Sequence, residues 1–143
     1  MELSLILEDQ SFTLYAMYGG SHNVDDFLAE LEHENEPAHS QIMRRLMDLA
    51  KHGSVKQNAT FKLLRQGVYE TRAKLGPRIL FFYDANHIVI CVCGFPKDGQ
   101  KTPKTLIDLA IERKKAYMAH KKSGKRFTIM TDDGIPPKRM PKP

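Results

Sequence analysis

The sequence lacks the features that mark membrane and secreted proteins. It has no run of about 18 apolar residues, so we expect no membrane-spanning helix. It has only two cysteines among 143 residues, which excludes a disulfide framework. Residues 1–9 are acidic, whereas a signal peptide begins with positive charge. These absences together predict a cytoplasmic protein.

Motifs for metal ions and nucleotide cofactors are also absent. There is no glycine-rich phosphate loop and no dinucleotide fingerprint, and the six histidines show no ligand spacing on a common element. Cys91 and Cys93 lie two apart on an expected strand, so we predict that they face the same way as buried, reduced thiols. Metal sites more often use pairs separated by two residues. We therefore expect no metal and no cofactor.

The composition and length fit one folded domain. Hydrophobic residues make up 41% and charged residues 27% of the chain, as in ordinary globular proteins. A length of 143 residues matches a prior of one domain per ~150 residues. We predict a domain over residues 1–118 and a basic, proline-containing tail over residues 119–143. The tail is either an arm that binds polyanions or an edge strand that docks on the domain.

Charge is unevenly distributed along the chain. Residues 1–36 contain nine acidic residues and no lysine or arginine, whereas the rest of the chain is strongly basic. A basic surface attracts polyanions and suggests a nucleic-acid partner. A solvated lysine surface with a basic tail is the alternative reading. The acidic segment either masks the basic surface or repels wrong partners.

Hydrophobic periodicity predicts the first elements. Residues 3–18 alternate and are expected to form two strands or one interrupted strand. Asn23 precedes a stripe of apolar residues at helical spacing, so it is expected to cap a helix. A second helix is expected over residues 37–52 and to end at Gly53. A helical hairpin therefore follows the first extended segment.

The second half of the chain changes to a period of two. Residues 68–74 and 78–83 are expected to form strands, and residues 88–95 are apolar throughout, which indicates a central strand buried on both faces. The last helix is expected to open with Thr102 as its N-cap and Pro103 at its first position. A short strand is also expected within residues 127–130.

Basic residues from neighbouring segments form the candidate site. Arg72 and Arg78 lie on adjacent expected strands, and Lys97 and Lys101 follow the central strand. Glu70 shares a strand face with Arg72 because the two are separated by one residue. Cleavage of RNA requires a base for the ribose 2′-hydroxyl, cations for the phosphate and an acid for the leaving oxygen. The alternative is that Arg72 pairs with Glu70 and the other cations are surface charges.

Four short blocks resemble one family of toxins. FKLLRQGVYETR (61–72), PRIL (77–80), GFPK (94–97) and QKTPK (100–104) look like the RelE/HigB toxins, specifically their phage-derived branch. The resemblance implies an α+β, RelE-like toxin fold. That fold has a small, twisted, mainly antiparallel sheet, an N-terminal helical hairpin and a C-terminal helix. One departure is Cys93, which stands where many relatives have a histidine.

The same resemblance implies a function and a set of site residues. It implies a metal-independent endoribonuclease (an mRNA interferase) that cuts mRNA on the ribosome. Its partner would be a helix-turn-helix antitoxin, with which it would form a heterotetramer. Arg72, Arg78 and Lys97 would be catalytic, and Glu70 would take part in proton transfer. The residues that would contact RNA or the ribosome are Lys62, Tyr69, Lys101 and Lys104.

Two rival functions remain open on the sequence. One is a toxin of the same fold that poisons DNA gyrase, as the ParE branch does. The other is a non-catalytic RNA-binding or phage regulatory protein, which the cysteine at position 93 favours. The grouping of RNA-facing cations favours the endoribonuclease.

Overall fold

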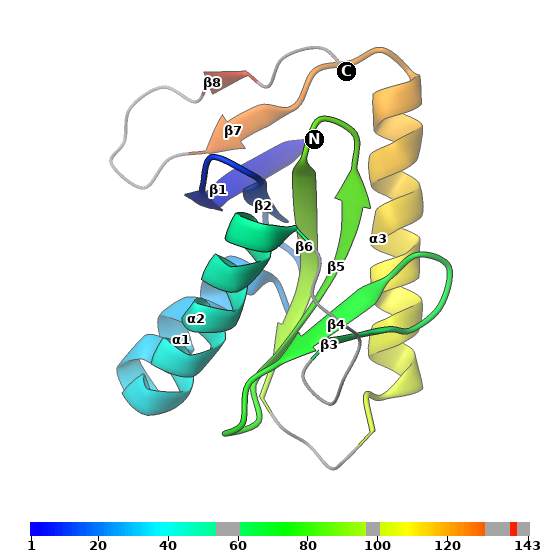
Figure 1. Cartoon of the computed structure of the whole chain (residues 1–143). Helices are drawn as coiled ribbons and strands as arrows, with labels where there is room; N and C mark the ends of the chain where they lie inside the picture. Colours follow the sequence, from blue (N-terminus) through cyan, green and yellow to red (C-terminus); the bar gives the residue numbers. More distant parts are fainter. Residues whose placement is uncertain (54–60, 97–100, 131–137, 140–143) are drawn as a thin grey trace.

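The chain folds into three layers, with one sheet between a pair of helices on one face and a single helix on the other (Figure 1). This computed structural model describes residues 1–53, 61–96, 101–130 and 138–139. Those residues form eight strands and three helices. The elements in chain order are β1 (Glu2–Glu8), β2 (Thr13–Met17), α1 (Val24–Glu34), α2 (Glu36–His52), β3 (Phe61–Leu63), β4 (Tyr69–Arg72), β5 (Arg78–Asp84), β6 (Ile88–Phe95), α3 (Lys104–Lys122), β7 (Thr128–Met130) and β8 (Lys138–Arg139).

The sheet is mixed and its strand order is β3-β4-β5-β6-β2-β1-β7-β8. Strand β2 pairs in parallel with β6, and β1 pairs in parallel with β7, whereas the other neighbours are antiparallel. The expectation of a small, mainly antiparallel sheet with an N-terminal helical hairpin and a C-terminal helix is wrong, because the sheet of the described residues is mixed and has eight strands, and strands both precede the hairpin and follow the last helix. Two strands precede the helices, and two short strands follow α3. Periodicity reveals that a segment is extended, but it does not specify which strand lies beside it.

Several local predictions are confirmed. Two strands occupy residues 3–18, and β6 lies inside the sheet as its uniformly apolar sequence indicates. The Asn23 side chain accepts a hydrogen bond from the Asp26 N–H and caps α1. Gly53 ends α2 with a φ of 77°. Within the predicted tail, the short strand expected over residues 127–130 forms as β7, which lies between β1 and β8 in the sheet. Helix α3 continues past Met118 to Lys122. The division of the chain at Met118 stays a prediction.

Each face of the sheet has its own hydrophobic core. One core lies beneath α1 and α2, where Ile42, Leu46 and Leu49 are at most 1% exposed. The other lies beneath α3 and includes Leu80, Phe82 and Tyr117, together with Phe127 from the segment before β7. A fully buried side chain of this size contributes roughly 1.5–3 kcal/mol to folding. These two cores hold the helices against the sheet.

A polar contact fixes the C-terminal half of α3 against β5. Asp84, at the end of β5, accepts hydrogen bonds from the Tyr117 hydroxyl and the Lys121 ammonium group. Burial raises the pKa of Asp84, but the hydrogen bonds from Lys121, Tyr117 and the Ala85 N–H outweigh it, so the net pKa is lowered. The carboxylate is therefore ionised at neutral pH and holds α3 at this end.

Within the described ranges, no helix combines the length and the apolar character that crossing a bilayer requires.

We predict that Gly53→Ala destabilises the protein more than Gly124→Ala does. Both glycines have nearly the same positive φ, 77° and 79°, so each substitution adds strain of about 1–2 kcal/mol. A Cβ at Gly53 would also lie 2.0 Å from Phe12 Cε1, whereas nothing lies within 4 Å of one at Gly124. We expect the difference between their free energies of unfolding, measured in urea, to be about 1–3 kcal/mol. Equal losses would contradict the packing of Phe12 on Gly53.

Candidate functional site

Four ionisable side chains lie on one face of the β3–β4–β5 edge of the sheet. Lys62 is directly opposite Glu70, and Arg72 is directly opposite Arg78. Glu70 and Arg72 are two residues apart on β4. Residues in these relations point to the same side of a sheet. Their face is the one that α3 covers, because Leu80, opposite Glu70, belongs to the core beneath α3.

A buried ion pair lies at the centre of this cluster. Glu70 and Arg78 are each 1% exposed, and Arg78 Nη1 lies 3.6 Å from Glu70 Oε1. The Thr102 hydroxyl bridges them, since it accepts a hydrogen bond of 3.0 Å from Arg78 Nη1 and donates one to Glu70 Oε1. Lys62 Nζ lies 3.9 Å from the other carboxylate oxygen of Glu70. The pair therefore joins two strands to the segment that leads into α3.

The participation of Thr102 corrects the expected start of α3. The sequence predicts Thr102 as N-cap, but the N-cap is Pro103 and α3 begins at Lys104 without a side-chain cap. The reason is that the Thr102 hydroxyl bonds Glu70 and Arg78 instead of the first turn of the helix. Sequence reasoning missed Thr102 as a site residue. Its only signal was a hydroxyl residue placed directly between Lys101 and Pro103.

Positive charge gathers at the N-terminus of α3. Lys101 and Lys104 are exposed there, and the first turn contains no acidic residue. A helix N-terminus carries partial positive charge, so cations at this position cost stability and acidic residues are normally favoured. The sequence thus places like charges together at this end of the molecule. Such an end attracts anions.

The remaining expected site residues lie elsewhere. Tyr69 is on the opposite face of β4, where its ring packs against Phe61, Phe81 and Tyr83 with centroids 5.1–5.8 Å apart. Lys97 lies outside the described residues. The structure thus brings Lys62, Glu70, Arg72 and Arg78 together, with Lys101 and Lys104 at the adjacent helix start. Arg72 is half-buried, whereas Arg78 is enclosed.

A bulge in β6 separates the two cysteines. Leu80 pairs with Cys93 and Phe81 with Cys91, so Val92 is the extra residue. Cys91 therefore packs beneath α1 and α2, whereas Cys93 packs beneath α3. The expectation that both thiols face the same way is wrong, because the bulge interrupts the alternation. Burial raises the pKa of the Cys93 thiol to about 11, although the charge and hydrogen bond of Arg113 act in the opposite direction. Cys93 is therefore a neutral thiol at physiological pH.

Two basic residues of α3 have structural roles. Arg113 donates hydrogen bonds to the Val92 carbonyl at 2.6 Å and to the Ser21 carbonyl at 2.5 Å. Lys114 donates to the Gln66 carbonyl at 2.6 Å. These contacts hold α3 against the bulge and against the loop between β3 and β4. Arg113 and Lys114 are therefore engaged with backbone carbonyls and less available to ligands.

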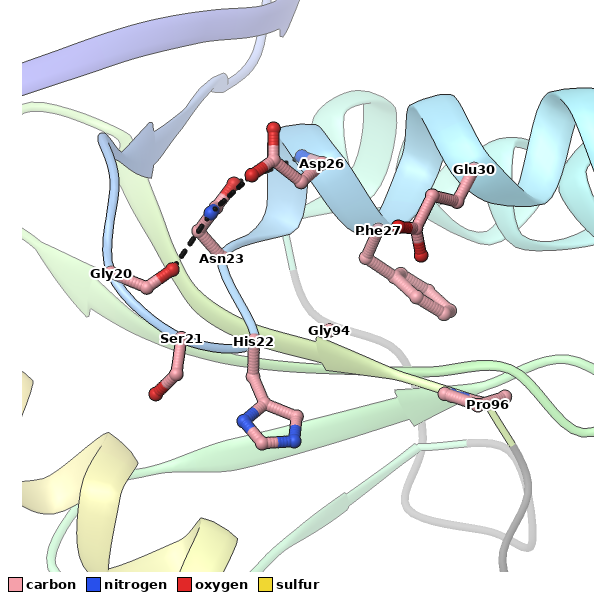
Figure 2. Close-up of a pocket in the computed structure, with 9 residues that line it drawn as sticks. All are labelled: Gly20, Ser21, His22, Asn23, Asp26, Phe27, Glu30, Gly94 and Pro96. Carbon is pink, nitrogen blue, oxygen red and sulfur yellow. Dashed lines mark hydrogen bonds between the residues drawn. The ribbon is translucent and has the colours of Figure 1, made fainter.

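A pocket of about 340 Å³ at the start of α1 is lined by acidic side chains rather than by lysine or arginine. Figure 2 shows Asn23 between Gly20 and Asp26, to which it donates hydrogen bonds of 2.8 and 2.9 Å. Asp26 and Glu30 line the pocket from α1, and the Phe27 ring packs over Gly94. Two carboxylates disfavour a phosphate here. This pocket is therefore a poor candidate for the nucleic-acid site.

The cationic cluster is suited to holding a phosphate. Lys62 and Arg72 are partly exposed, and Lys101 and Lys104 are exposed in the segment that Thr102 connects to Glu70 and Arg78. A guanidinium group can meet two phosphate oxygens at once, and a lysine adds a mobile point charge. In the part of the chain that the structure describes, no three histidine, cysteine or carboxylate side chains are arranged to hold a metal ion. The arrangement favours electrostatic stabilisation of a phosphodiester.

We predict that the buried pair is energetically coupled. Glu70→Leu leaves the Arg78 cation enclosed without its carboxylate, which should reduce the free energy of unfolding by about 3–5 kcal/mol. The double variant Glu70→Leu/Arg78→Met removes both charges and should lose less than Glu70→Leu alone. Urea denaturation of the two single variants and the double variant measures the coupling. A double variant that loses the sum of the two single losses would contradict the coupling.

We also predict that neither cysteine reacts with iodoacetamide in the folded protein. Both thiols are buried, and burial raises the pKa of Cys93 to about 11, so little thiolate is present at pH 8. Both should react once urea unfolds the chain, and mass spectrometry counts the added groups. Rapid labelling of Cys93 in the native protein would contradict its enclosed position beneath α3.

A family comparison covers most of this architecture. Residues 26–115 match the family model described as phage-derived protein Gp49-like. The matched region runs from the first turn of α1 to within α3 and contains every residue of the cationic cluster. A search of curated proteins found no match. The chain belongs to the Gp49-like family of phage-derived proteins, a family of RelE-like toxins in toxin–antitoxin systems.

Proposed function

We propose that the protein is the toxin of a toxin–antitoxin pair and that it cuts mRNA on the ribosome. Membership of the Gp49-like family supports the toxin role. The observation that carries the nuclease role is the cationic cluster of Lys62, Arg72, Lys101 and Lys104 around the buried Glu70–Arg78 pair. Translating ribosomes would place its action in the cytoplasm.

The proposed reaction is attack of the ribose 2′-oxygen on the adjacent phosphorus. The bond from phosphorus to the 5′-oxygen breaks, and a 2′,3′-cyclic phosphate forms. A base removes the proton from the 2′-hydroxyl, and an acid returns a proton to the departing 5′-oxygen. Negative charge grows on the phosphate oxygens in the transition state, so fixed cations around it lower the barrier.

Arg72 is the main phosphate ligand in this proposal. It is half-buried and lies opposite Arg78 in the β4–β5 pairing, so its side chain leaves the sheet on the same face as Glu70 and Arg78. Lys62 and Lys101 contribute further positive charge from β3 and from the segment before α3. Lys97 keeps its proposed role in stabilising the transition state, and it lies outside the described residues. Lys104 is proposed to contact the RNA backbone.

Glu70 and Arg78 have a positioning role in this proposal. Both are 1% exposed, and they bond one another and Thr102. An enclosed carboxylate with these partners is poorly placed to meet a ribose hydroxyl, and an enclosed guanidinium is poorly placed to meet a phosphate. Their effect is to hold β4 and the start of α3 together, so that Arg72 and Lys101 converge.

The proposed partner is a helix-turn-helix antitoxin. Association of the family with toxin–antitoxin systems supports it. An antitoxin that covers the cationic cluster would block access of RNA to Arg72. The proposal includes assembly of toxin and antitoxin as a heterotetramer.

We predict that Arg72→Gln abolishes growth arrest when the toxin is induced without an antitoxin. Loss of one cation that stabilises the transition state should lower the cleavage rate about 10²–10³-fold. Primer extension on translated and untranslated copies of one mRNA maps the cuts, and cuts are expected only on the translated copy. Arg126→Gln is the matched control, because Arg126 is exposed and lies outside the cluster.

Two results would overturn the proposal. Growth arrest by Arg72→Gln equal to that of the wild type would remove Arg72 from the mechanism. Growth arrest with intact mRNA and inhibited DNA gyrase would favour the rival gyrase-directed toxin. Circular dichroism of each variant distinguishes loss of function from loss of fold.

A further inference from the structure

A second group of cations lines a cavity between α2 and the turn that joins β4 to β5. The cavity has a volume of about 290 Å³ and is lined by Ser40, Gln41, Arg44, Arg45 and Lys74. Figure 1 shows the β4–β5 turn and α2 at the same end of the sheet. Two elements far apart in sequence thus bring three positive charges to one hollow. The cavity shares no residue with the cationic cluster, and the family description assigns it no role.

The turn is anchored so that Lys74 stays beside α2. The Gln41 side chain accepts a hydrogen bond of 2.9 Å from the Leu75 N–H. The turn is closed by hydrogen bonds from the Ala73 N–H to the Pro77 carbonyl and from the Gly76 N–H to the Ala73 carbonyl. Lys74 therefore projects from a fixed backbone rather than from a free loop.

The charges of the cavity are not neutralised within the described part of the chain. The ion pairs among those residues involve other side chains, and none includes Arg44, Arg45 or Lys74. Asp48 is the nearest carboxylate along α2, one turn after Arg44, and it is not within ion-pair distance of either arginine. Like charges held together favour a bound anion. Ser40 and Gln41 add hydrogen-bonding groups to the lining.

We propose that this cavity is a second phosphate-binding site, which holds the backbone of the same RNA outside the cleavage site. Lys74 follows Arg72 by two residues, so one hairpin carries a cation to each site. Arg44 and Arg45 would bind a phosphate through their guanidinium groups, and Lys74 would contact it from the turn. The contact reads no base and serves to position the strand. This inference rests on RNA being the substrate proposed above.

RNA binding tests the cavity separately from cleavage. The probe is a labelled, single-stranded RNA of about 16 nucleotides with 2′-O-methyl riboses, which lacks the attacking hydroxyl and stays intact. Fluorescence anisotropy measures its Kd over a range of salt concentrations. The test variant is Arg44→Gln/Lys74→Gln. The control is Lys51→Gln/Arg126→Gln, which removes the same charge, one residue from α2 and one from a loop.

We expect the cavity variant to bind about tenfold more weakly than the wild type and the control to change Kd less than twofold. The slope of log K against log salt should fall by about 0.7 for the lost phosphate contact. Equal weakening in both variants would overturn the proposal, because it would mean that only the overall charge matters. Failure of the wild type to bind the RNA would also overturn it.

Comparison with Arg72→Gln separates the two proposals. If the cavity variant loses RNA affinity while Arg72→Gln still cuts mRNA, the second phosphate site stands and the proposed cleavage site fails. If Arg72→Gln stops cleavage while the cavity variant binds RNA like its control, the cleavage site stands and the second phosphate site fails.

Discussion

The arrangement of the candidate site depends on one buried ion pair. A charged group away from water is tolerated only with an opposite charge and further hydrogen bonds. Arg78 and Glu70 meet that requirement through each other and through the Thr102 hydroxyl. These contacts fix β4, β5 and the start of α3 relative to one another. The pair therefore also positions the partly exposed cations around it.

Two groups of cations outside the candidate site have different surroundings. Arg113 and Lys114 donate to backbone carbonyls and so hold α3 on the sheet. Arg44, Arg45 and Lys74 line a hollow where the described residues offer them no ion pair. Net charge alone does not distinguish these groups. The distinction lies in whether a carbonyl or carboxylate lies within reach.

Acidic and basic residues line different pockets of the molecule. The acidic first quarter of the sequence supplies Asp26 and Glu30 to the pocket at the start of α1. The cationic cluster and the basic cavity lie on other elements. A polyanion is therefore attracted to the cationic cluster and to the basic cavity and is repelled from the acidic pocket. This segregation orients an incoming RNA in the function proposed here.

The sequence by itself determined most local elements and, in strands without a bulge, which residues share a face. Asn23 and Gly53 mark helix ends through their own chemistry, and alternation places Glu70 with Arg72 and turns Tyr69 to the other side. Only the tertiary structure decided the parallel β2–β6 pairing, the bulge at Val92 and the burial of Arg78. Each of these depends on a partner distant in the chain. Local periodicity carries the direction of a side chain but not the identity of what lies opposite it.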